Sequence, residues 1–134
     1  MIDRESEIFT TIATVLRTAF SGIYVAGEYV SQPPTFPAVL IVEVDNSVYQ
    51  PGIDSGDIEN FADVMYQVDV YSNKTRGKKA ECKSIIAEID TEFKKMGFRR
   101  TFLNPVQNMN DATIYRMTGR YRAIIGKDDN TYRR

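Results

Sequence analysis

Apolar residues near the N-terminus recur at the spacing of an amphipathic helix, at positions i, i+4, i+7, i+8 and i+11. They are Ile8, Ile12, Val15, Leu16 and Ala19. This spacing places them on one stripe of a helix. Asp3 or Ser6 can cap its start, and the pair Ser21 and Gly22 is expected to end it.

A second apolar stripe with helical spacing lies in the middle of the chain. It comprises Cys82, Ile85, Ile86, Ile89, Phe93 and Met96. Thr75 or Asn73 is the expected N-cap of this helix. Gly97 suits the left-handed position at its end, and Phe98 suits the hydrophobic contact that closes such an end.

Between and after these helices, several segments alternate between apolar and polar residues, as strands do. They are "AVLIVEVDNSVY" (38–49), "FADVMYQVDVY" (61–71), "FRRTFLNPVQNM" (98–109), which we expect Pro105 to interrupt, and "IYRMTGRYRAII" (114–125). A shorter extended piece, "IYVAGEYV" (23–30), precedes "SQPPTFP", where three prolines exclude helix. The order is therefore α-β-β-β-α-β-β.

This order predicts an α+β fold, because strands joined by short links pair antiparallel and leave both helices on one face. We expect a two-layer sandwich with a mainly antiparallel sheet. Residues 1–134 form one domain, which is enough chain for a single core. A flexible loop near 49–60 and a polar C-terminal tail near 126–134 complete the prediction.

The last predicted strand separates its aromatic residues from its arginines. Period 2 places Tyr115 and Tyr121 on the face toward the core. The opposite face receives the arginines, and we expect acidic residues of the neighbouring strands to join them. The expected set is Glu43, Asp45, Asp63, Asp69, Arg116, Arg120 and Arg122, with Ile41, Met65 and Ile114 among them. Such a mixed face suits a subunit interface or the wall of a channel.

The link between the second and third strands is longer than the usual hairpin loop of about 2–5 residues, and such loops are often functional. Its candidate contact residues are Tyr49, Gln50, Ile53, Asp54, Asp57 and Glu59. The stretch "DSGDIE" does not have the spacing of a calcium-binding EF-hand.

Four basic residues precede the second helix in "YSNKTRGKK": Lys74, Arg76, Lys78 and Lys79. A phosphate-binding Walker loop is not formed, since Ser72 stands where its first glycine belongs and Lys79 where its hydroxyl residue belongs. Positive charge here opposes the helix dipole, which favours contact with an anion or an acidic partner. A solvated charge run is an equal alternative.

Composition narrows the possible chemistry. The chain has 134 residues, a formal net charge of −1, one cysteine and no histidine. Zinc sites of the usual kinds and histidine-dependent nucleophiles are therefore excluded, and we expect no cofactor. A catalytic pair of carboxylates, as in glycosidases, stays possible, but the sequence does not indicate which two of the 18 acidic residues would form it. The lone Cys82 fits a reducing compartment and a buried, inert thiol. We expect no membrane span and no secretory signal.

Several segments resemble the tail terminator, or tail-completion, proteins of long-tailed bacteriophages. They are "FPAVLIVEVDNSVYQ", "MYQVDVYSNKTRGKKAECKSI", "GFRRTFLNPVQNMNDATIYRMTGRYRAII" and the ending "YRR". The most specific marks are "DNS" at 45–47, "VYSNKTRGKK" and "ATIYRMTGRY". The element order is also similar to that family's fold.

The resemblance implies a structural virion protein at the head–tail junction, assembled in the cytoplasm of the host bacterium. Such proteins form a hexameric ring on the tail tube, end its polymerisation and present a surface to head-completion proteins. DNA passes through the ring without sequence-specific binding, and the loop 49–60 would face the tube. Alternatives are a head–tail connector or neck protein and, in a different class, a small nucleic-acid-binding module. An enzyme is the reading that the sequence favours least.

Overall fold

A computed structural model describes residues 1–49, 61–107, 111–127 and 131–132. The elements run α1 (Glu5–Ala19), β1 (Tyr24–Ala26), β2 (Ala38–Val48), β3 (Phe61–Ser72), α2 (Lys78–Lys95), β4 (Arg99–Val106), β5 (Tyr115–Gly126) and β6 (Thr131–Tyr132). The predicted order is confirmed. One short strand is added within the stretch expected to be a polar tail, where β6 pairs with Ile124 and Ile125 of β5.

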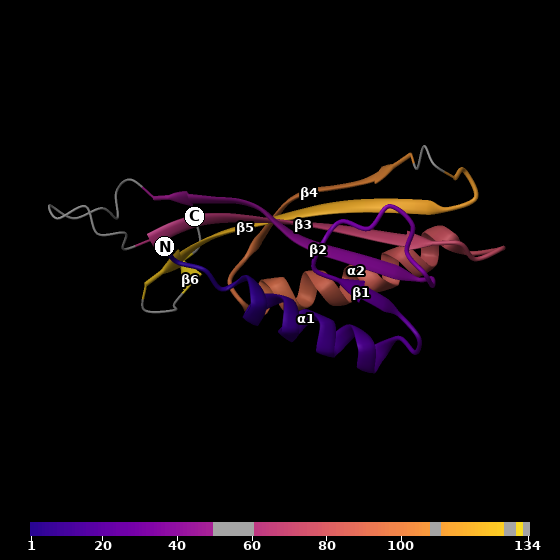
Figure 1. The fold of residues 1–134 in the computed structure, drawn as a ribbon, viewed down its shortest axis with the longest axis horizontal. Helices are drawn as coiled ribbons and strands as arrows, with labels where there is room; N and C mark the ends of the chain where they lie inside the picture. The colour runs from indigo at the N-terminus through magenta and orange to yellow at the C-terminus, as the bar shows by residue number, and fades with distance from the viewer. Residues whose placement is uncertain (50–60, 108–110, 128–130, 133–134) are drawn as a thin grey trace, which may run out of the picture.

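The strands form one sheet in the order β1-β2-β3-β5-β4, with β6 paired to β5. Only the pairing of β1 with β2 is parallel among the pairings described; the others are antiparallel. Figure 1 shows both helices on the same side of the sheet, which gives two layers. The predicted α+β sandwich is therefore confirmed. We name the two sides of the sheet the helix-covered face and the helix-free face.

The main core lies between the helix-covered face and the apolar stripes of α1 and α2. At its centre the Phe93 ring stacks on Tyr121, with ring centroids 4.3 Å apart and an angle of 11° between the planes. Phe98 meets Phe93 edge-on at 5.1 Å and Tyr66 at 5.6 Å. Aromatic rings bury large apolar areas and gain further from such geometries, so this group joins α2 to the two central strands.

The two ends of α2 differ in how well the sequence predicted them. Gly97 has φ 86°, and the N–H of Phe98 donates to the carbonyl of Phe93 at 2.9 Å. This confirms the predicted C-terminal motif. The predicted N-caps Thr75 and Asn73 are wrong. The N-cap is Gly77 at φ 81°, with no capping side-chain hydrogen bond, because the chain enters the helix through a left-handed turn that favours glycine.

The start of α1 and the course of β4 also needed correction. The N-cap of α1 is Arg4, with no capping side-chain hydrogen bond, so neither predicted residue is the N-cap. Asp3, one residue earlier, accepts a hydrogen bond from the N–H of Glu5 at 3.1 Å, and Ser6 lies inside α1. Pro105 does not interrupt β4, which runs to Val106. β4 is an edge strand paired with β5 alone, and an edge tolerates a residue that lacks an N–H.

A small second core lies at one end of the helix-free face. Leu40 and Tyr71 are buried there against Phe36, which belongs to the proline-rich segment after β1. Ile114 packs on the same group. The proline-rich segment thus covers part of a face that would otherwise be open to solvent. Among the described residues, no helix is long and apolar enough to cross a membrane.

Candidate functional site: the helix-free sheet face

The antiparallel register of β3 and β5 builds a row of polar side chains across the helix-free face. Asp69 lies opposite Thr118, and Gln67 lies opposite Arg120. Directly opposed residues of paired strands point to the same face. We use the name charged ladder for the polar side chains of this row: Asp63, Gln67, Asp69, Arg116, Thr118, Arg120 and Arg122.

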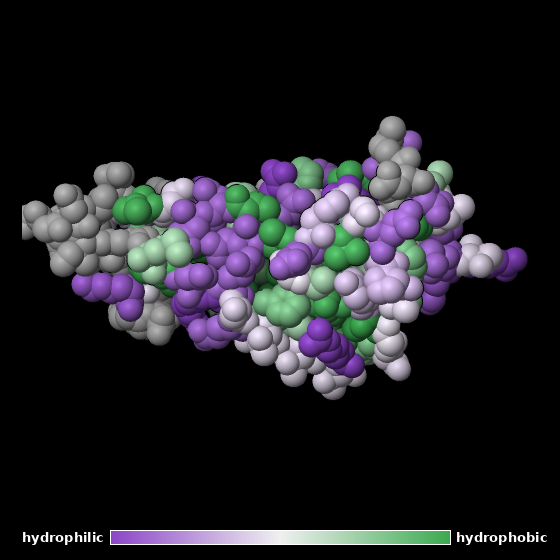
Figure 2. All heavy atoms as spheres, in the orientation of Figure 1, coloured by the Kyte–Doolittle hydropathy of each residue, from purple (hydrophilic) through white to green (hydrophobic). Residues whose placement is uncertain are grey.

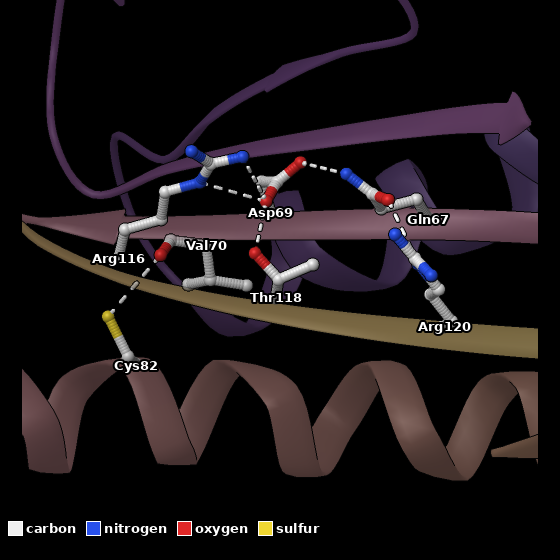
Figure 3. Close-up of polar contacts among 7 residues, drawn as sticks. All are labelled: Gln67, Asp69, Val70, Cys82, Arg116, Thr118 and Arg120. Carbon is white, nitrogen blue, oxygen red and sulfur yellow. Dashed lines mark hydrogen bonds and ion pairs between the residues drawn. The ribbon is translucent and has the colours of Figure 1, made fainter. Parts of the chain in front are cut away.

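Asp69 is the centre of the charged ladder (Figure 3). Its Oδ1 accepts hydrogen bonds from Arg116 Nε at 3.0 Å and from Thr118 Oγ1 at 2.5 Å. Its Oδ2 accepts one from Gln67 Nε2 at 3.1 Å. Only 8% of Asp69 is exposed, so these donors replace the water that the carboxylate loses on folding.

Gln67 also connects Asp69 to the exposed Arg120, because Arg120 Nε donates a hydrogen bond to Gln67 Oε1 at 3.1 Å. The Arg120 guanidinium also lies 5.4 Å from the ring centre of Phe102 on β4, and that of Arg116 lies 5.6 Å from Tyr71. These are cation–π distances. Sequence reasoning missed both rings. The parity that Tyr71 shares with Asp69 could have revealed one of them.

Arg122 forms a second, separate ion pair with Asp63 through two nitrogens. Nε donates to Oδ1 at 2.7 Å, and Nη2 contacts Oδ2. The hydrogen bond to Asp63 is the main reason that the pKa of Arg122 is raised, with smaller help from the charge of Asp45. A two-point contact of this kind fixes the direction of the guanidinium as well as its charge.

Glu43 and Ile41 do not lie on this face, which corrects two of the sequence-based assignments. Ile41 is buried in the main core, and Glu43 Oε2 accepts a hydrogen bond from the Tyr66 hydroxyl at 2.7 Å on the helix-covered side. The register of β2 shifts between Glu43 and Asp45. A β-bulge inserts one extra residue, so simple alternation fails across it. Asp45 therefore does lie on the helix-free face, opposite Met65.

Glu43 instead joins a small acidic group with Asp3 and Glu5, whose carboxylate oxygens lie within 4.8 Å of one another. Glu5 Oε2 accepts a hydrogen bond from the N–H of Glu43 at 3.0 Å. Desolvation, followed by the contact with Glu43, raises the pKa of Tyr66, so its hydroxyl stays protonated. Among the described residues this is the group of side chains that could hold a metal ion.

The four basic residues before and within the first turn of α2 do not meet the charged ladder. Lys74 Nζ lies 3.6 Å from Glu81 Oε2, and Glu81 also accepts a hydrogen bond from the Ser72 hydroxyl at 2.6 Å. Arg76, Lys78 and Lys79 have no ion pair with any described residue. Arg76 and Lys79 are exposed. They are the free positive charges that the sequence suggested.

Of the candidate contact residues in the link between β2 and β3, the structure describes Tyr49 alone. Tyr49 makes an edge-on contact with Phe61 at 6.4 Å. The remaining loop candidates lie outside the described residues: Gln50, Ile53, Asp54, Asp57 and Glu59.

Cys82 is fully buried, and burial raises the pKa of its thiol to about 12. It is therefore a poor nucleophile at neutral pH.

Opposite charges lie together on the helix-free face, where Arg99 of β4 also lies opposite Arg122 of β5. Three arginines of β5 share it with Asp45, Asp63 and Asp69, and two of those arginines are ion-paired within the chain. Paired charges attract nucleic acid weakly, but their fixed directions can set the register of a protein contact. Comparison with protein-family models and with curated proteins finds no match to the chain.

Proposed function

We propose that this protein is a structural component of a phage virion that forms a ring on the end of the tail tube. The ring ends tube polymerisation and joins the tail to head-completion proteins, and DNA passes through it. The proposal assigns no catalysis and no cofactor to the chain. Hexameric symmetry, placement at the tail–head junction and assembly in the host cytoplasm belong to the same proposal.

The observation that carries the proposal is the position of the two most specific marks of the resemblance. "VYSNKTRGKK" begins in β3, and "ATIYRMTGRY" leads into β5 and contains its first seven residues. These strands are direct neighbours, with Val70 opposite Met117 and Ser72 opposite Tyr115. Segments far apart in the sequence therefore belong to one structural unit, in a fold whose order is the one that the resemblance implies.

The ion pairs that the chain itself forms on the helix-free face are the second support. A ring must join identical copies through surfaces that fix orientation, and paired charges do this better than they add affinity. Exposed ion pairs contribute only about 0–1 kcal/mol each, so apolar contacts must supply most of the association energy. The loop 49–60 is the part we assign to contact with the tube.

Size-exclusion chromatography with light scattering, on the protein alone and mixed with the tail-tube protein, tests the proposal. We expect a ring-sized species or co-elution with tubes. A protein that stays monomeric alone is compatible with assembly on a template. A protein that stays monomeric and never joins tubes contradicts the proposal.

A neck protein is the alternative within the virion, and labelling on purified particles separates the two. Label on the portal side that never reaches the tube favours the neck.

The free charges of Arg76, Lys78 and Lys79 favour a second class, a nucleic-acid-binding module. That module would bind DNA at low salt and lose affinity steeply as salt rises. Absence of binding at low salt removes it.

A further inference from the structure

A groove lined by both apolar and acidic residues lies beside the N-terminal half of α1. It has a volume of about 400 Å³ and is lined by Phe9, Tyr24, Val30 and Ile41, with Glu5 and Glu28 among its polar residues. Glu28 is exposed and has no ion pair with a described residue. We call this site the acidic groove.

This combination of side chains suits a long cationic side chain. The aliphatic part of an arginine or lysine can lie on an apolar floor while its charged end reaches a carboxylate. A guanidinium also gains from aromatic rings within about 6 Å, and Phe9 and Tyr24 line the groove. The chemistry of the acidic groove therefore selects a basic segment.

The chain itself carries such a segment, made of Lys74, Arg76, Lys78 and Lys79, which we call the basic segment. Figure 1 shows the connection between β3 and α2 projecting at one end of the molecule, far from the N-terminus that leads into α1. Figure 2 shows strongly hydrophilic atoms at that projecting tip. Among the described residues, no ion pair joins the basic segment to the acidic groove.

We propose that the acidic groove of one copy receives the basic segment of a second copy, with Arg76 entering between Glu5 and Glu28. This inference rests on the proposed ring function and adds a second contact between its subunits, beside the one that we assign to the helix-free face. The two surfaces differ, so the contact is head-to-tail. Repeated contacts of this kind close into a ring when the rotation between copies allows it.

Cysteine crosslinking tests the contact directly, because the single native thiol of Cys82 is buried. Chains carrying Ser6→Cys in the acidic groove and chains carrying Thr75→Cys beside Arg76 keep both charges of the contact. They are mixed at high protein concentration and low salt, with and without tail tubes, and then oxidised. We expect a mixed disulfide dimer. The control mixture pairs Ser6→Cys with Lys127→Cys, which replaces an exposed lysine outside both surfaces. A dimer yield no higher than the control's overturns the contact.

Charge reversal supplies a second readout by sedimentation. Arg76→Glu and Glu28→Arg should each weaken association by roughly tenfold or more, because like charges then meet. A double variant that carries both changes in one chain should recover most of the lost association, because opposite charges then meet again. Lys127→Glu, with the same change in net charge as Arg76→Glu, should leave association unchanged. Full association by Arg76→Glu would contradict the assignment.

The two proposals fail in different ways. Rings that cap tubes without a crosslink between positions 6 and 75 would leave the proposed function intact and remove this contact. A specific crosslink between these positions, together with tubes that are never capped, would leave the copy-to-copy contact and remove the proposed function.

Discussion

The two faces of the sheet are built from alternating residues of the same strands, but one face forms the apolar core and the other carries a polar network. Tyr66 and Tyr121 point to the helix-covered face and are each 1% exposed in an aromatic core. Asp69 and Arg120, only a few residues away, point to the helix-free face and bind one another through Gln67. Burial of apolar area stabilises the fold, whereas the ladder's directional bonds fix a surface. A residue's face thus predicts which property its loss will change.

The largest effect is expected from emptying the aromatic core. Phe93→Ala removes a fully buried ring that contacts Tyr121 and Phe98, and should cost about 3–5 kcal/mol in the free energy of unfolding. Urea denaturation followed by circular dichroism measures it. Phe102→Ala, which removes a partly buried ring from the edge strand β4, is the matched control and should cost much less. Equal costs would break the comparison between the faces.

A smaller loss is expected at the centre of the charged ladder. Asp69→Ala deprives Arg116, Thr118 and Gln67 of their shared acceptor, and should cost about 2 kcal/mol, the scale of hydrogen bonds to a charged group. The same denaturation measurement applies. Asp63→Ala, which removes a separate pair with Arg122, gives the control for loss of one carboxylate. An Asp69→Ala protein as stable as the wild type would show that the ladder contributes no stability.

Alkaline pH should weaken the helix-covered side through Cys82. Its pKa rises on folding from 9.0 to about 12, so above pH 9 the unfolded chain releases a proton that the folded chain keeps. Stability from this group is therefore complete below pH 9 and falls between pH 9 and 12. The loss is about 1.4 kcal/mol per pH unit once the unfolded thiol ionises.

The measurement is the change in unfolding free energy between pH 8 and pH 10, in the wild type and in Cys82→Ala. Tyr66 and Tyr121 also have raised pKa values, mainly because of burial. Both proteins should therefore lose stability, and the wild type should lose more. Identical pH dependence in the two proteins would show that Cys82 ionises freely in the folded state.

The smallest effect on folding is expected from Arg120→Glu. The side chain is exposed and makes one hydrogen bond to Gln67 and a contact with Phe102, so stability should change by less than about 1 kcal/mol. Assembly should be disturbed more, because we propose that copies meet through the helix-free face, on which this residue lies. Thermal denaturation and light scattering are compared with Lys83→Glu on the outer side of α2. A mutant that unfolds readily yet still assembles would reverse the roles of the two faces.

Period-2 alternation predicted the faces of β5 correctly, because that strand pairs without a break along β3. The same rule failed in β2. A bulge near Val44 is not marked in the sequence by glycine or proline, and it moves Glu43 to the side opposite Asp45. Alternation also cannot give cross-strand register. The bond of Asp69 to Arg116 and Thr118 joins residues 47 and 49 positions apart, and it depends on how β3 and β5 are aligned.

Helix ends could be predicted where a few neighbouring residues determine the backbone conformation. Gly97 and Phe98 end α2 as expected, because the left-handed position and its hydrophobic contact are both encoded within a few residues. The start of α2 was misjudged because Gly77 supplies the N-cap without a side chain. The cover of the helix-free face by Phe36 was missed, because proline-rich segments have no periodicity to interpret.

Electron microscopy of tail tubes polymerised with and without this protein tests the central claim most directly. We predict a ring of this protein at one end of each tube, shown by labelling, and tubes that stop growing once it is bound. Tubes of unchanged length whose ends carry no label would contradict the account.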